Sequence, residues 1–111
     1  MKEILDSLKT SIDGIIEIFL MDTKGNIFAS SISELLEKEI KKVASSISLF
    51  ITLVSDRLNV DRLDFLSSEG AILVVIRNNF ALVYITSRKV NLDFLYLLGK
   101  QCLRLVEGNK S

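Results

Sequence analysis

Residues 15–30, IIEIFLMDTKGNIFAS, decide the fold, because an apolar run breaks at one polar turn and then resumes. Residues 15–21 are apolar apart from Glu17, which predicts a strand that is buried on both faces. Asp22 can bond back to the backbone, and Gly25 can adopt the positive φ that a short hairpin loop needs. The stretch therefore predicts a hairpin whose shorter returning strand, residues 27–30, lies at an edge of the sheet.

The loop from Asp22 to Asn26 also offers hard oxygen ligands, so a cation site is the alternative to a plain turn. Lys24 stands where a calcium loop would carry another acid, and no glutamate follows at the distance that such a loop requires. The residue pattern therefore favours the turn, and we expect no metal site here.

Three segments have helical periodicity. The first covers residues 4–12, where one face carries Ile4, Leu5, Leu8 and Ile12. A long helix of about six turns starts at Ser33, with Glu34 in its first turn. Asn91 caps a final helix, whose apolar face comprises Leu92, Leu95, Leu98, Cys102 and Val106. On this face Cys102 is expected to be a core thiol instead of a redox sensor.

Three further strands follow the long helix. Residues 60–66 alternate charged and apolar side chains, which predicts a strand less buried than the first. Residues 71–76 and 80–86 are continuously apolar and should be central, and polar turns at 68–70 and 77–79 precede them. The predicted order is αββαβββα, an α/β sandwich.

The long helix has a broader apolar surface than one sheet face needs. Its main stripe recurs at intervals of three and four and comprises Leu36, Ile40, Val43, Ile47, Phe50 and Val54. Ala44, Ile51 and Leu53 widen this stripe, so we expect a second surface to pack against the helix. The opposite face is basic at its start and then small and mild, with Lys38, Lys41, Ser45, Ser48, Leu49 and Thr52. Such a face would let a protein surface approach closely, and a merely tolerated solvent face is the alternative.

Composition excludes several classes of function. The 14 Lys and Arg balance 14 Asp and Glu, so nothing indicates nucleic-acid binding. Histidine is absent and Cys102 is the only thiol, which excludes a Cys/His metal set, an internal disulfide and most nucleophilic triads. No apolar run reaches the roughly 20 residues that cross a bilayer, and no secretory signal pattern is present, so we expect a cytoplasmic protein without membrane insertion. A chain of 111 residues fits a single domain, residues 1–111.

Glu17 is the one acid inside a buried run, and its charge needs a partner or a route to water. It marks an uncovered part of the sheet, or it pairs with Lys or Arg of a neighbouring helix. No second acid of fixed geometry accompanies it, as acid/base catalysis would require. We therefore expect no catalytic residues, and Arg88-Lys89 is interpreted as a solvated loop.

The element order, the length and the sequence texture together resemble the roadblock family, the dynein light chain roadblock and its bacterial and archaeal relatives. The resemblance rests on Ile12-Asp13-Gly14-Ile15-Ile16, the Asp22-Thr23-Lys24-Gly25-Asn26-Ile27 hairpin with Ala29-Ser30, the helix from Ser33, Gly70-Ala71-Ile72-Leu73-Val74 and Asn91-Leu92. These motifs cover essentially the whole chain and none of them is catalytic. Their order and spacing, not any single motif, carry the resemblance.

The resemblance implies a five-stranded antiparallel sheet with the long helix on one face and the two terminal helices on the other. Family members pair through the long helix and the strand after it. The dimer interface would then include Ala44, Ile51, Leu53, Val60, Arg62, Asp64 and Leu66. In roadblock proteins the paired long helices form a platform for small GTPases or other roadblock-type domains. Here that platform would consist of Lys38, Lys41, Ser45, Ser48, Leu49 and Thr52.

From this resemblance we expect a homodimeric interaction module that binds and regulates or positions a small Ras-like GTPase. We expect no catalytic, cofactor-binding or metal-binding residues in this chain. Any accessory effect on GTP hydrolysis would come from holding the switch residues of the GTPase in place. One alternative is a scaffold subunit that pairs with a different roadblock-type chain. A small-ligand sensor is the other, although the apolar strands offer few convergent polar groups.

Overall fold

The structure, a computed structural model, has the predicted order of helices and strands, and it describes residues 1–31 and 37–108. The elements are α1 (Lys2–Ser11), β1 (Ile15–Asp22), β2 (Ile27–Ser30), α2 (Glu37–Ser55), β3 (Arg62–Leu66), β4 (Gly70–Arg77), β5 (Phe80–Ser87) and α3 (Leu92–Gly108). The order αββαβββα is confirmed. The predicted start of the long helix at Ser33 lies outside the described residues.

The five strands form one antiparallel sheet in the order β2-β1-β5-β4-β3. The three inner strands are those with continuous apolar runs, because their two faces are both covered by helices. The two strands predicted to be less buried, β2 and β3, lie at the edges. The sequence-based assignment of central and edge strands is therefore confirmed.

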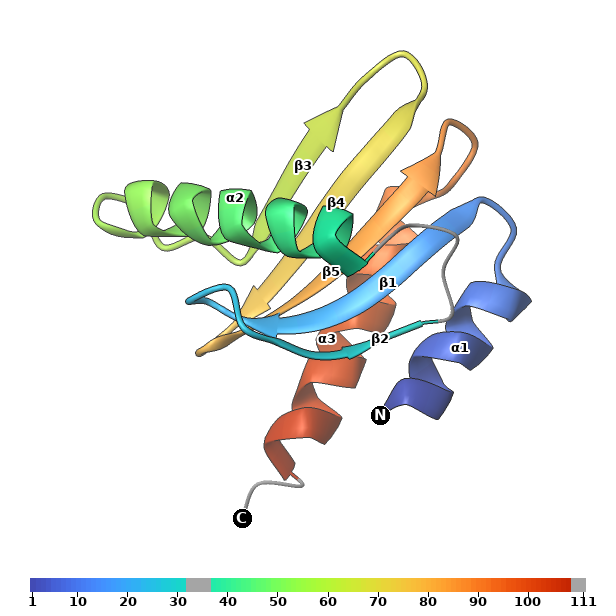
Figure 1. The fold of residues 1–111 in the computed structure, drawn as a ribbon, viewed down its shortest axis with the longest axis horizontal. Coiled ribbons are helices and arrows are strands. Elements are labelled where there is room, and N and C mark those ends of the chain that lie inside the picture. Colours follow the sequence, from blue (N-terminus) through green and yellow to red (C-terminus); the bar gives the residue numbers. More distant parts are fainter. Residues whose placement is uncertain (32–36, 109–111) are drawn as a thin grey trace.

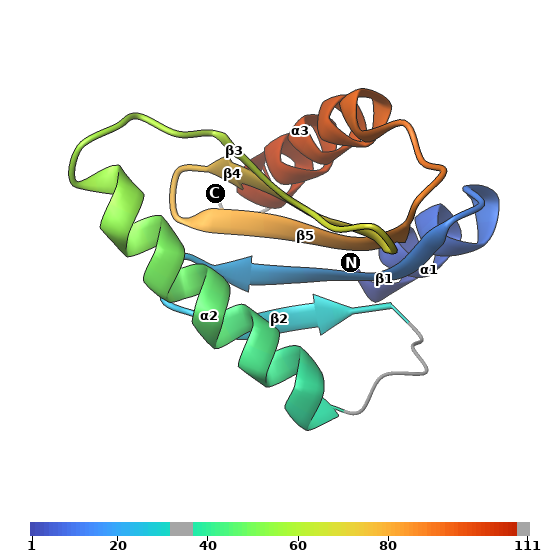
Figure 2. The ribbon, with the colours of Figure 1, turned by 90° about the horizontal axis from the view of Figure 1, so that it is seen from above.

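The helices form a layer on each face of the sheet. α2 crosses one face, and α1 and α3 cover the other, as Figures 1 and 2 show. Under α2 the core includes Phe19, Met21 and Val83, and under α1 and α3 it includes Leu20 and Tyr84. The layers that the resemblance implies are confirmed.

The final helix has the predicted cap residue and the predicted buried thiol. Asn91 Oδ1 accepts a hydrogen bond from the Phe94 amide at 3.1 Å, which is the expected N-cap. Cys102 is buried in the core under α3, and burial raises the pKa of its thiol. The interpretation of Cys102 as a core residue is therefore confirmed.

The loop between β1 and β2 is a turn in which Asp22 uses both carboxylate oxygens. Oδ1 accepts hydrogen bonds from the amides of Lys24 and Asn26, both at 2.9 Å, and Oδ2 accepts one from the Asn26 side chain at 2.8 Å. Gly25 has a φ of 97°, a left-handed conformation that favours glycine. The turn interpretation is confirmed, since the loop itself satisfies the carboxylate.

Glu17 is completely buried on the α2 side of the sheet, so it does not mark an uncovered region. Its described partners are the Ser31 hydroxyl, which donates to Oε1, and the Ile18 amide at 3.0 Å. The Ile18 amide also reaches the Ser31 hydroxyl oxygen at 3.0 Å. The expected pairing with Lys or Arg is therefore corrected. Within residues 1–31 and 37–108, Glu17 forms no ion pair and accepts a hydrogen bond from the Ser31 hydroxyl instead.

The Asp22 turn makes hairpin stability dependent on pH. The hydrogen bond from the Asn26 side chain, with further backbone hydrogen bonds, lowers the pKa of Asp22 below its usual 3.8. Because the folded pKa is the lower one, this stabilisation is complete above the unfolded pKa and is lost as pH falls through the folded pKa. Asp22→Asn should therefore be less stable than the natural chain at about pH 7, with the difference shrinking toward about pH 2.5.

Urea unfolding followed by circular dichroism at both pH values would measure this difference. Asp13→Asn is the matched control, because Asp13 is an exposed acid without a hydrogen bond in the described part of the chain. A pH-independent difference between the natural chain and Asp22→Asn would contradict the role given to the carboxylate.

Candidate interaction site

α2 packs on the sheet through one row of apolar residues. Ile40, Ala44, Ile47 and Ile51 recur at intervals of four, three and four, and all are buried. They contact the α2 side of β1, β4 and β5. Ala44 is completely buried, which brings the helix backbone close to the sheet.

The row that faces the sheet is not the one that we predicted. Val43 and Val54 are half-buried and Phe50 is 42% exposed, whereas Ala44 and Ile51 are in the core. The placing of Ala44 and Ile51 on a flank that is free for a second chain is therefore corrected. Both rows share Ile40 and Ile47, so spacing alone does not distinguish them, and the small Ala44 side chain permits the closer approach.

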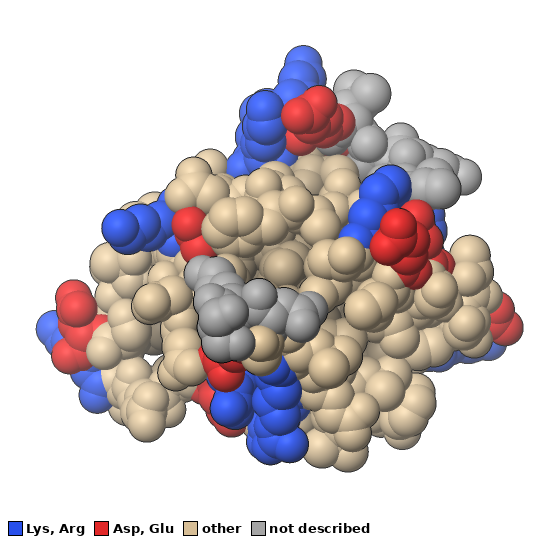
Figure 3. Space-filling view, turned by 90° about the horizontal axis from the view of Figure 1, so that it is seen from below, with Lys and Arg blue, Asp and Glu red and all other residues tan. Residues whose placement is uncertain are grey.

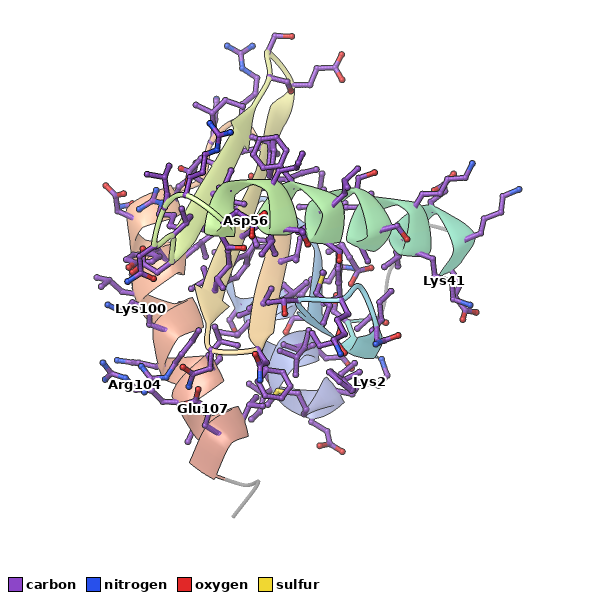
Figure 4. The ribbon with its side chains drawn as sticks, turned by 90° about the vertical axis from the view of Figure 1, so that its left-hand side faces the viewer. Lys2, Lys41, Asp56, Lys100, Arg104 and Glu107 are labelled. Carbon is purple, nitrogen blue, oxygen red and sulfur yellow. The ribbon has the colours of Figure 1, made fainter. Side chains whose placement is uncertain are left out.

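The outer face of α2 is exposed, as predicted. Lys38, Lys41, Ser45, Leu49 and Thr52 are all open to solvent, and Leu49 is 64% exposed. Lys41, near the start of the helix in Figure 4, pairs with Glu37 one turn earlier at 3.4 Å. We call this face, together with Ser48, the α2 outer face.

Ser48 is the half-buried member of the α2 outer face. Its hydroxyl donates a hydrogen bond to the Thr23 carbonyl oxygen at 2.8 Å, which ties the middle of the helix to the β1–β2 turn. The Thr23 amide in turn donates to the Asn79 carbonyl oxygen at 2.9 Å, in the β4–β5 turn. Two hairpin turns and α2 are thus linked at one point.

An apolar groove runs between α2 and β3, and the sequence analysis missed it. The rings of Phe50 and Phe65 meet edge to face, with centroids 5.1 Å apart. A hollow of about 330 Å³ beside them is lined by Lys42, Val43, Ser46, Ile47, Phe50, Phe65 and Ile72. The groove could have been predicted from the alternating charged and apolar residues of β3, which place Leu63 and Phe65 on the α2 side of the sheet.

The outward-facing edge of the sheet at β3 has no neighbouring strand in the described part of the chain. The opposite edge is partly covered, because the Lys2 ammonium of α1 donates to the Ser30 carbonyl oxygen of β2 at 3.3 Å. Leu66, at the end of β3, is 72% exposed, and Val60 lies just before the strand, half-buried. The β3 edge is therefore the more open of the two.

Arg62 fixes β3 to the face of the sheet that carries α3. Its guanidinium pairs with both Asp64 oxygens, at 2.8 and 2.9 Å, and with Asp93 of α3 at 2.8 Å. It also lies over the Tyr96 ring, 5.1 Å from the centroid, and the Tyr96 hydroxyl donates to Asp61 at 2.6 Å. The hydrogen bonds to Asp64 and Asp93 raise the pKa of Arg62 above its usual range. Arg62 and Asp64 thus bind within their own chain.

Solved structures contain the same arrangement of sheet and helices. A roadblock/LC7 domain from Streptomyces avermitilis matches with a TM-score of 0.83 at 12% sequence identity, over 98% of this chain and 96% of that one. The chain has the roadblock fold. MglB of Myxococcus xanthus matches with a TM-score of 0.76 at 14% identity, over 96% of this chain and 94% of that one.

A further MglB structure, described as having a tetrameric arrangement, matches with a TM-score of 0.73 at 14% identity, over 89% of this chain and 79% of that one. No protein-family model and no curated protein sequence matches the chain. At these identities the likeness is one of fold.

The surface of this roadblock fold limits the kinds of site that it offers. In Figure 3, acidic and basic side chains lie side by side around the rim of the face seen from below, and most of that face is uncharged. Among the described residues, no His, Cys, Asp and Glu form a group of three or more that could hold a metal ion. None of the described helices is long and apolar enough to span a membrane.

The orientation of α2 can be tested by adding the same side chain at two adjacent positions. Ala44→Leu should lower the free energy of unfolding by about 1–3 kcal/mol, because a larger side chain does not fit between helix and sheet. Ser45→Leu should change it by no more than about 0.5 kcal/mol, because Ser45 is exposed.

Chemical denaturation of both variants would measure the two differences. Equal effects at positions 44 and 45, or a larger one at 45, would place a different row of α2 against the sheet.

Proposed function

We propose that this chain is a single-domain, cytoplasmic interaction module that forms a homodimer and binds a small Ras-like GTPase, which it regulates or positions. The observation that carries the proposal is the exposure of Leu49, Phe50 and Leu53 on the helix that borders the open β3 edge. A row of large apolar side chains beside an unpaired strand is typical of a surface that another protein covers.

Pairing through this side would satisfy both features at once. Two copies related by a two-fold axis would place their β3 edges together and their α2 helices side by side. Leu53 of α2 and the groove residues Val43 and Phe50 would then be removed from water. Leu66 and Val60 lie at the two ends of the strand segment that would pair. Asp64 binds Arg62 within the same strand, and Arg62 ties the strand to Asp93 of α3.

The α2 outer face would remain free in such a dimer and would be doubled by the symmetry. Its small polar residues, Ser45 and Thr52, allow a close approach, Leu49 supplies apolar contact, and Lys38 and Lys41 supply charge. We infer that a GTPase docks there. Any acceleration of hydrolysis would come from ordering the switch segments of the GTPase, because phosphoryl transfer depends on positioning and electrostatics.

A scaffold role, in which the chain pairs with a different roadblock-type chain, uses the same surfaces and is the second candidate. The small-ligand sensor has less support. Among the described residues the buried polar side chains include Glu17, Ser31 and Thr86. Glu17 and Ser31 bond to each other, and Thr86 bonds to the Ala71 carbonyl oxygen at 3.3 Å on the other face of the sheet. They do not converge on one cavity, as a ligand site requires.

The dimer has a matched pair of tests on opposite faces of the sheet. Leu53→Glu should dissociate it, because a charge would be buried against the second chain, and light scattering on a sizing column would show the monomer mass. Leu105→Glu on α3 is the control, since Leu105 is exposed to a similar extent, 55% against 63%. A natural chain that is already monomeric, or equal effects of both variants, would contradict pairing through α2.

The GTPase partner can be tested with small Ras-like GTPases loaded with GDP or a GTP analogue. The natural chain should bind the GTPase in one nucleotide state in preference to the other. Lys38→Glu/Lys41→Glu should weaken this binding by about tenfold or more, because it reverses the charge of the α2 outer face. Leu105→Glu should bind unchanged. Failure to bind in both nucleotide states, with the dimer intact, would favour the scaffold role.

A further inference from the structure

The outer face of α3 carries a second exposed apolar surface, on the side of the sheet opposite to α2. Phe94, Leu97 and Leu105 are 49%, 58% and 55% exposed. Their spacing of three and eight positions puts them on one face of the helix, with the exposed Gln101 between the last two. This α3 stripe is about 16 Å long, from the rise of a helix over these positions.

The α3 stripe borders a hollow that is rich in cations. The hollow, of about 930 Å³, lies among the β1–β2 turn, the end of α2 and the segment after it, the β4–β5 turn and α3. Its lining includes the cations Lys24, Arg57, Arg77, Lys100 and Arg104, and the acids Asp56 and Asp61. Figure 4 faces this side of the molecule and shows Lys100 and Arg104 projecting to the same side of α3.

Lys100 and Arg104 form the charged flank of the α3 stripe. They follow Leu97 by three and seven positions, so they lie beside it along the helix. Within residues 1–31 and 37–108, neither of them forms an ion pair, and the Lys100 ammonium lies over the Tyr96 ring, 5.2 Å from its centroid. This flank therefore presents positive charge that the chain does not neutralise.

Of the acids around this flank, three are already engaged, and the fourth, Asp56, lines the hollow but forms no ion pair with Lys100 or Arg104 in the described part of the chain. Glu107 pairs with Arg77 at 2.8 Å, and its side chain also accepts a hydrogen bond from Asn78. Asp93 pairs with Arg62, and Asp61 accepts the hydrogen bond of the Tyr96 hydroxyl. A carboxylate from another molecule would thus meet Lys100 and Arg104 without competing for them.

We propose that this face binds an acidic amphipathic helix of a partner protein. The apolar side chains of that helix would cover Phe94, Leu97 and Leu105, and its carboxylates would pair with Lys100 and Arg104. Apolar contact on one side and charge on the other define one orientation for the bound helix.

The shape of the hollow distinguishes a helix from an anionic membrane. Its cations are distributed over four segments around a concavity, where Lys24 and Arg57 lie on segments other than α3. Acidic side chains projecting from a bound helix can enter such a concavity, whereas a flat bilayer would contact only its rim. Thr52 of the α2 outer face also lines this hollow, but the residues that would hold the bound helix, Phe94, Leu97, Lys100, Arg104 and Leu105, all lie on α3. The proposal therefore does not depend on GTPase binding.

A phage-displayed library of random peptides, about 16 residues long so that a helix spans the stripe, is the probe. Selection uses the natural chain, with counter-selection on Lys100→Glu/Arg104→Glu. Enriched peptides should carry Asp or Glu on one helical face and Leu or Phe at intervals of three and four. Fluorescence anisotropy would then measure the affinity of an enriched peptide. The peptide should bind Leu105→Ser and the charge-reversed variant, Lys100→Glu/Arg104→Glu, about tenfold more weakly than it binds the natural chain. A peptide with its acids changed to Lys should recover binding to the charge-reversed variant.

Leu53→Ser on α2 is the control and should bind the enriched peptide as the natural chain does, even where it alters the dimer. Thermal unfolding of each variant would show that it is folded. The proposal is overturned if enriched peptides lack acids, or if they bind the charge-reversed variant equally well. It is also overturned if the chain binds vesicles of anionic phospholipid through Lys100 and Arg104 but binds no peptide.

Discussion

The burial of the inner strands on both faces is the constraint on which the rest of the structure depends. Phe19 and Leu20 are neighbours in β1 and point to opposite sides of the sheet, yet both are buried. Burial of apolar surface contributes roughly 25 cal/mol per Å², so leaving either face open to water would be costly. The sheet therefore needs helices on both sides, and α1 and α3 share one face while α2 covers the other alone.

A single helix covers its face incompletely, and this leaves apolar side chains exposed beside it. The inner strands are eight residues long, about 26 Å, whereas a helix with its side chains is about 10 Å wide. α2 crosses the strands, so part of their length extends beyond it (Figure 1). The apolar groove beside Phe50 and Phe65 lies at that margin. The same helix thus completes the core with one row of residues and leaves Leu49, Phe50 and Leu53 exposed.

Polar contacts hold the elements that frame these surfaces. The Ser48 hydroxyl ties α2 to the β1–β2 turn, and Arg62 ties the edge strand to α3. At Gly99, an added Cβ would lie 2.9 Å from a Val75 methyl carbon, so α3 lies as close to the sheet as a glycine permits. With both helices fixed in this way, Phe94, Leu97 and Leu105 remain on the outside of α3.

Local chemistry was enough to predict the order of the elements, the central strands, the Asp22 turn and the Asn91 cap. Each of these depends on residues that are close in sequence, as the contacts of Asp22 with Asn26 and of Asn91 with Phe94 illustrate. The exposed members of the α2 outer face were also predicted, because a helix separates its polar and apolar faces by spacing alone.

Tertiary packing decided which row of α2 meets the sheet, since Ala44 with Ile51 and Val43 with Phe50 fit the same spacing. It also decided the partners of the buried and edge charges. Glu17 meets Ser31 across 14 positions, and Arg62 meets Asp93 across 31. No local pattern specifies such contacts, because they form only when strands and helices distant in the chain pack against one another and exclude water.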